Sequence, residues 1–158
     1  MPGVKLTRIM NKIYLLITAL FLGSQVYSQE VPVQWTFDAV KLSEGKYEVK
    51  LVANIKNSWH IYSSTTPEGG PIPTSISFTK NPLTVLSGKF KEVGKLERHY
   101  EKVFGLDTHF YNGKVEFVQA VNLKGRGKTN LTGTVEYMAC TDKECLPPKE
   151  VPFTIALK

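Results

Sequence analysis

The 158-residue sequence is poor in cysteine, in helical patterning and in long apolar segments. It has no G-x-S-x-G sequence, no paired carboxylate motif and no phosphate-binding glycine loop, so it gives no support to the common hydrolase and nucleotide-binding sites. Lysine and arginine do not cluster with aromatic residues, which argues against a nucleic-acid partner. Repeats and low-complexity linkers are also absent. These absences point to one ordinary domain with a small, local functional site.

The main apolar run, residues 13–22, is too short to span a bilayer. Three basic residues precede it, and the small residue Ser28 offers a cleavage point. This pattern predicts a secretion signal over residues 1–28 and a domain over residues 29–158. No cysteine lies near the cleavage point, so we expect no lipid anchor and no membrane anchor after cleavage. Beyond residue 28 the sequence holds 17 basic and 14 acidic residues, a net charge of +3.

Alternation with a period of two dominates the rest of the sequence and predicts β-strands. The clearest strands are expected at residues 33–40, 46–55, 74–79, 114–123, 131–140 and 151–157. Residues 83–86 and 89–96 are weaker strand candidates, residues 65–73 form a Pro/Gly loop, and residues 97–110 are the least regular segment. We therefore predict an all-β fold, an immunoglobulin-like antiparallel β-sandwich of about eight strands.

The two cysteines, Cys140 and Cys145, are separated by four polar or charged residues and are followed by Pro147-Pro148. A strand leads into them, so the segment reads as a strand, a tight turn and a rigid exit. In an exported protein we expect a disulfide between them. Closing so short a loop stabilises a fold by only about 2 kcal/mol. The residues leave three interpretations open: a structural staple, a redox-active pair, or half of a metal site.

A metal site would need further ligands, and the candidates are the histidines His60, His99 and His109, none of which shows paired spacing. Met138 and Cys140 with a histidine would suit copper. His60 and Tyr62 either lie on one face of a short strand, opposite Trp59 and Ile61, or lie beside the cysteines and tune a thiolate. Residues 100–105 either pack into the core or form a loop over a reactive site.

Taken together, four stretches of the sequence resemble the N-terminal periplasmic domain family of the thiol:disulfide interchange protein DsbD. They are Trp59-His60-Ile61-Tyr62, residues 66–74 (TPEGGPIPT), Val103-Phe104-Gly105, and residues 137–148 with both cysteines and the double proline. The resemblance covers essentially all of residues 29–158.

The resemblance implies an immunoglobulin-like sandwich whose catalytic residues are the redox pair Cys140 and Cys145, with no cofactor. It implies that His60 and Tyr62 flank this pair, and that Glu101, Val103 and Phe104 belong to a cap loop that shields it. The sequence departs from the family pattern in two details of the site. Four residues separate the cysteines where well-known members have five, and His60 stands where an aromatic residue is familiar.

The resemblance also implies partners: thioredoxin-like proteins that supply electrons, and periplasmic disulfide-containing substrate proteins that receive them. The sequence contains neither the membrane domain nor the thioredoxin-like domain of the family, so we expect a separate membrane electron carrier. The expected location is the periplasm. Two other hypotheses remain: a non-catalytic β-sandwich binding module with a structural disulfide, and a periplasmic copper-binding sandwich.

Overall fold

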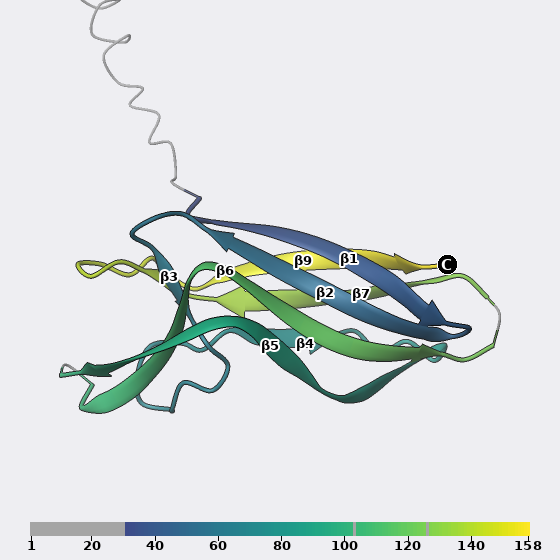
Figure 1. Ribbon diagram of the computed structural model, residues 1–158, viewed down its shortest axis with the longest axis horizontal. Coiled ribbons are helices and arrows are strands. Elements are labelled where there is room, and N and C mark those ends of the chain that lie inside the picture. The colour runs from purple at the N-terminus through teal and green to yellow at the C-terminus, as the bar shows by residue number, and fades with distance from the viewer. Residues whose placement is uncertain (1–30, 103, 126) are drawn as a thin grey trace, which may run out of the picture. The chain divides into compact units, whose positions relative to one another are not determined.

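The computed structural model describes residues 31–102, 104–125 and 127–158. The predicted signal peptide, residues 1–28, lies outside the described residues, as does Val103. Within the described residues the chain forms nine strands and no helix (Figure 1).

The strands form two antiparallel sheets. One sheet has the order β1 (Val33–Ser43), β2 (Lys46–Ile55), β6 (Leu106–Leu123), β3 (His60–Tyr62), β8 (Ala139–Cys140), and β5 (Thr84–Glu101) also pairs with β6. The other sheet has the order β4 (Ser75–Phe78), β7 (Thr129–Tyr137), β9 (Lys149–Leu157). This arrangement confirms the predicted all-β, immunoglobulin-like antiparallel sandwich.

The core lies between the two sheets and follows the alternation of the sequence. In β2 the residues Tyr47, Val49, Leu51, Ala53 and Ile55 are all buried, as the pattern predicts. They pack with Trp59, just before β3, and with buried residues of the other strands: Val33, Ile61, Tyr111, Val115, Phe117, Val121, Leu131, Val135, Tyr137, Ala139, Phe153, Ile155 and Leu157. The alternating faces therefore decide which side of each strand points inward.

The prediction that residues 97–110 are irregular is wrong. Strands β5 and β6 run through this segment as one long hairpin, with Leu96 paired with Tyr111 and Glu101 paired with Leu106. The turn at its tip is closed by backbone bonds from Phe104 and Gly105 to the carbonyl of Glu101. The sequence shows no apolar alternation here because this outer half of the hairpin carries mainly polar and charged side chains on both faces. Backbone pairing holds it as a strand pair, together with a hydrogen bond from the Thr108 hydroxyl to the carbonyl of His99.

Two glycines allow the outer half of this hairpin to change direction. The β5–β6 register shifts beside Gly94, where a Cβ atom would lie 3.1 Å from the carbonyl oxygen of Lys114 and 3.2 Å from the ring of Tyr111. On the facing strand Gly113 has a φ of 69°, which glycine adopts readily. Such irregularities bend a strand pair. The hairpin tip and the loop that carries the cysteines both lie at the end of the sandwich opposite the β1–β2 turn (Figure 1).

Candidate functional site

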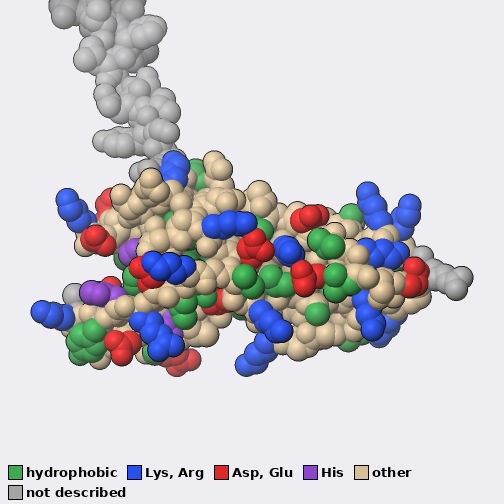
Figure 2. Space-filling model, viewed as in Figure 1, with side chains coloured by type: hydrophobic (Ala, Val, Ile, Leu, Met, Phe, Trp, Pro, Cys, Tyr) green, Lys and Arg blue, Asp and Glu red, His purple; other side chains and the backbone are tan. Residues whose placement is uncertain are grey.

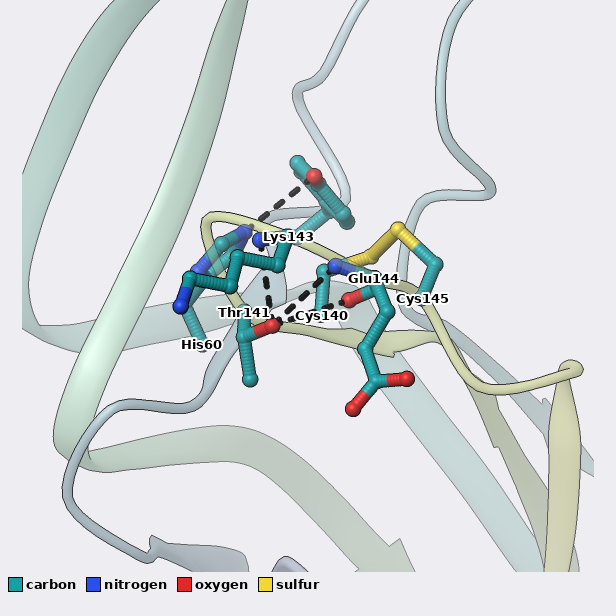
Figure 3. The surroundings of a disulfide bond; sticks show 7 residues. His60, Cys140, Thr141, Lys143, Glu144 and Cys145 are labelled. Atoms are coloured by element: carbon teal, nitrogen blue, oxygen red, sulfur yellow. Dashed lines mark hydrogen bonds between the residues drawn. A yellow bond between two sulfur atoms is a disulfide. The ribbon is translucent and has the colours of Figure 1, made fainter.

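Cys140 and Cys145 form a disulfide at the tip of a hairpin (Figure 3). They face each other as antiparallel neighbours, and their Cα atoms are 4.0 Å apart. Backbone hydrogen bonds join the residue pairs on either side of the disulfide. Ala139 is bonded to Leu146, and Thr141 is bonded to Glu144. The cysteines thus occupy a pair without hydrogen bonds of its own, where facing side chains approach most closely. The hairpin geometry explains why these two sulfurs meet.

Thr141 orders the turn between the cysteines. Its N–H donates to the carbonyl of Glu144 at 2.8 Å, and its Oγ1 accepts hydrogen bonds from the N–H groups of Lys143 at 3.2 Å and Glu144 at 3.1 Å. The turn is therefore held by bonds that do not depend on the disulfide. Sequence reasoning missed Thr141, although a threonine before Asp142-Lys143 is a signal for such a side-chain turn.

The two sulfur-bearing residues differ sharply in exposure. Cys140 has no exposed surface, since β8 is paired with β3, whereas Cys145 is exposed. An incoming thiol or disulfide can therefore reach Cys145 and not Cys140.

Strand β3 places His60 and Tyr62 beside the cysteines. His60 is directly opposite Cys140 in the β3–β8 pairing. Its Nε2 is hydrogen-bonded to the hydroxyl of Tyr62 at 3.2 Å, and its ring lies 4.8 Å from that of Phe110 between centroids. The intervening Ile61 points into the core. His60 and Tyr62 lie next to the pair, as the family resemblance implies, and their roles stay a prediction.

Burial governs the protonation of both side chains. It lowers the pKa of His60 below its usual 6.5, although the carboxylates of Asp142 and Glu101 act in the opposite direction. Burial, with a further contribution from the Glu101 carboxylate, raises the pKa of Tyr62 to about 12. At pH 7 His60 is neutral and Tyr62 is protonated, so both offer hydrogen bonds without charge.

A groove of about 890 Å³ opens beside Cys145. Its walls come from the segment before β3, from β3, from the outer half of the β5–β6 hairpin and from the cysteine hairpin. The lining residues are Ser58, His60, Tyr62, Glu97, His99, Glu101, Phe104, Phe110, Asn112, Thr141, Asp142, Lys143, Glu144 and Cys145.

Two residues of the predicted cap loop line this groove. Glu101 is the last residue of β5 rather than part of a loop, and Phe104 lies in the turn with 46% of its surface exposed. Sequence reasoning did not connect Glu97 and Asn112 with the site. The spacing of Glu97 and Glu101, which places both on one face of a strand, could have indicated Glu97 once residues 97–101 were recognised as a strand.

The copper hypothesis finds no support in the described residues. No group of three or more His, Cys, Asp or Glu side chains in them is placed to hold a metal ion. The sulfur of Cys140, which that hypothesis used with Met138, is bonded to Cys145. His109 instead contacts the Thr65 hydroxyl, with its Nδ1 at 2.9 Å. In the same part of the chain, no helix is long and apolar enough to cross a membrane.

Comparison with known proteins identifies the family. The family model for the N-terminal part of the thiol:disulfide interchange protein DsbD matches residues 28–156. The chain belongs to this family. Its members' thiol–disulfide chemistry fits the Cys140–Cys145 disulfide seen here. No curated protein matches the sequence.

Two solved structures share the fold of this DsbD N-terminal family member. The DsbD N-terminal domain of Neisseria meningitidis in its reduced form has a TM-score of 0.53 at 14% identity, covering 84% of this chain and 94% of that one. The N-terminal periplasmic domain of ScsB from Proteus mirabilis has a TM-score of 0.52 at 21% identity, covering 85% of this chain and 49% of that one. The chain therefore spans about half the length of the ScsB structure.

Proposed function

We propose that the protein is an exported thiol–disulfide exchange module. It passes reducing equivalents between a thioredoxin-like donor and periplasmic partner proteins through Cys140 and Cys145. The observation that carries this proposal is the exposure difference within one disulfide: a reachable sulfur at Cys145 and a buried sulfur at Cys140, at the edge of an open groove. Such a pair suits sequential attack, in which one sulfur meets the partner and the other resolves the mixed disulfide.

In the reduced protein, the Cys145 thiolate attacks one sulfur of a partner disulfide. A bond forms between Cys145 and that sulfur, and the partner's other sulfur leaves as a thiolate and takes up a proton. The Cys140 thiolate then attacks Cys145, which restores the Cys140–Cys145 disulfide and releases the partner's first sulfur, also to be protonated. Two electrons have moved from the pair to the partner. Reduction by a thioredoxin-like donor is the reverse sequence.

The neighbouring side chains have roles in this proposal. His60 lies opposite Cys140 and is neutral at pH 7, so it can accept the proton of the Cys140 thiol as that sulfur attacks. Phe104 and Glu101 line the groove from the hairpin side, where they meet the partner that reacts with the exposed Cys145. Val103, which the resemblance assigns to the same tip, lies outside the described residues.

We also propose the setting in which the module acts. Residues 1–28 direct export, residues 29–158 form the periplasmic domain, and a membrane electron carrier passes electrons to the thioredoxin-like donors. Family membership supports this setting, because the related ScsB domain is described as periplasmic.

Two measurements test the function. Equilibration in glutathione redox buffers gives the potential of the Cys140–Cys145 bond, and a value below about −300 mV would favour a structural disulfide instead. In cell extracts, a Cys140→Ala variant should accumulate mixed disulfides through Cys145, because the resolving sulfur is missing. The matched Cys145→Ala variant should accumulate few, since Cys140 is buried. Equal trapping by both variants, or none by either, would contradict the proposal.

A further inference from the structure

The groove beside Cys145 carries an excess of carboxylates. Among its lining residues, Glu97, Glu101, Asp142 and Glu144 are acidic, and Lys143 is the basic one. The chain beyond residue 28 has the opposite balance, with 17 basic and 14 acidic residues. The surroundings of the Cys145 sulfur are therefore net negative, whereas the chain beyond residue 28 has a net positive charge.

The alternation of β5 separates the charges of its outer half. Glu97, His99 and Glu101 line the groove, whereas the intervening Arg98 and Tyr100 do not, because successive side chains of a strand point to opposite faces. In Figure 2 histidines, carboxylates and apolar side chains gather at this end of the sandwich, with lysine or arginine side chains beside them.

The cysteine hairpin supplies the other carboxylates. Figure 3 shows the side chains of Lys143 and Glu144 pointing away from each other on the two sides of the turn. In the part of the chain that the structure describes, no Lys or Arg forms an ion pair with Glu101, Asp142 or Glu144.

Other groups offset this charge only weakly. Glu97 pairs with the highly exposed Lys95 at 3.2 Å, and exposed pairs of this kind are weak. His60 is neutral at pH 7 because burial lowers its pKa. The carboxylates therefore act on any charged molecule that approaches Cys145.

We infer that this groove selects partners whose reactive disulfide is surrounded by basic side chains, and that it disfavours anionic disulfides such as oxidised glutathione. The inference rests on the proposed exchange function and names the partner class of the same site. Complementary charge around the contact speeds encounter, and like charge suppresses wrong partners. A protein with this groove would reduce disulfides on basic protein surfaces faster than it reduces small anionic disulfides.

Three small disulfides test the inference on the purified, reduced protein: cystamine, which is cationic, dithiodipropionate, which is anionic, and the neutral 2-hydroxyethyl disulfide. The quantity measured is the ratio of the second-order rate constants for the cationic and anionic probes. A variant with Asp142→Asn and Glu144→Gln removes two groove carboxylates. The matched control, Glu44→Gln with Glu48→Gln, removes two at and beside the β1–β2 turn, at the opposite end of the sandwich.

We expect the groove variant to lower the ratio about tenfold at low ionic strength, because each carboxylate acts in opposite directions on the two probes. The control should keep the wild-type ratio, and about 1 M salt should remove the difference between wild type and groove variant, since the Debye length then falls to about 3 Å. Differences between the probes' leaving thiols cancel when variants are compared. An unchanged ratio in the groove variant would overturn the inference. Failure of the wild type to reduce the neutral probe would instead overturn the exchange function itself.

Discussion

Reducing the Cys140–Cys145 disulfide should leave the sandwich folded and lower its free energy of unfolding by about 2 kcal/mol, the loop-entropy value for cysteines five residues apart. The structure explains why the loss should be no larger. Backbone bonds flank the pair on both sides, Thr141 holds the turn, and neither cysteine belongs to the core cluster. A loss of about 2 kcal/mol is modest beside the 5–15 kcal/mol that stabilise typical domains.

The same free energy links stability to redox behaviour. If the disulfide stabilises the fold by about 2 kcal/mol, the folded protein is harder to reduce than the unfolded chain by the same amount, or about 45 mV for a two-electron couple. A small stabilisation is what an exchange module needs, because the reduced state must stay folded to meet the next partner.

Denaturant unfolding of the oxidised and the dithiothreitol-reduced protein measures this difference. A Cys140→Ala/Cys145→Ala variant serves as the control and should unfold at one denaturant concentration with or without reductant. A reduced protein that is unfolded in native buffer, or a loss above about 5 kcal/mol, would refute the reasoning, since no loop of this length reaches that value. The disulfide would then be a structural staple.

Three further predictions concern the fold and the site. Gly133→Ala should lower the free energy of unfolding by about 3 kcal/mol, because a Cβ would lie 2.3 Å from the Ser77 carbonyl oxygen and 2.5 Å from the Phe153 ring. Gly127→Ala, with nothing within 4 Å, should stay within about 0.5 kcal/mol, and equal thermal midpoints for the two variants would contradict this. The pKa of Tyr62, about 12, lies above its ordinary value of 10, so its contribution to stability is present below pH 10 and is lost as pH rises through 12. Tyr62→Phe should reduce that alkaline loss in unfolding experiments, and its absorbance titration should lack the tyrosine that titrates near pH 12. Tyr111, whose pKa is also raised by burial and by its hydrogen bond to Glu92, keeps the rest of the loss. Because burial lowers the pKa of His60 in the folded protein, the unfolded chain binds a proton first as pH falls below about 6.5. The free energy of unfolding should therefore fall in this pH range in the wild type, and fall less in His60→Gln. Identical pH profiles for the two proteins would count against a buried, neutral His60.

The strands that line the core were predictable, and the outer half of the β5–β6 hairpin was not. In β2 every second residue from Tyr47 to Ile55 is apolar and buried, so the sequence pattern and the structure agree. In residues 97–101 the side chains on both faces of the strand are mainly polar or charged. Their strand structure comes from pairing with residues 106–110, which leaves no hydrophobic signal. The bend at Gly94 likewise depends on the close approach of Lys114 and Tyr111.

The candidate site was only partly predictable. The cysteines stand out because the sequence has no others, and the family resemblance pointed to His60 and Tyr62. Neither source indicated that His60 lies directly opposite Cys140, since 79 residues lie between them in the sequence and the contact exists only through the β3–β8 pairing. Thr141 and Glu97 were missed for the same reason: their roles depend on where a turn or a strand face lies in space.

By itself the sequence determined that this is a β protein and that one cysteine pair is available for its chemistry, because alternation and composition are local properties of the chain. The tertiary structure alone decided which sulfur is reachable. Cys140 is buried because β8 pairs with a strand from far along the chain, and Cys145 is exposed because the hairpin returns on the side of the groove. The acidic surroundings of Cys145 also arise only in three dimensions, where carboxylates of the β5–β6 hairpin and of the cysteine hairpin meet around one groove.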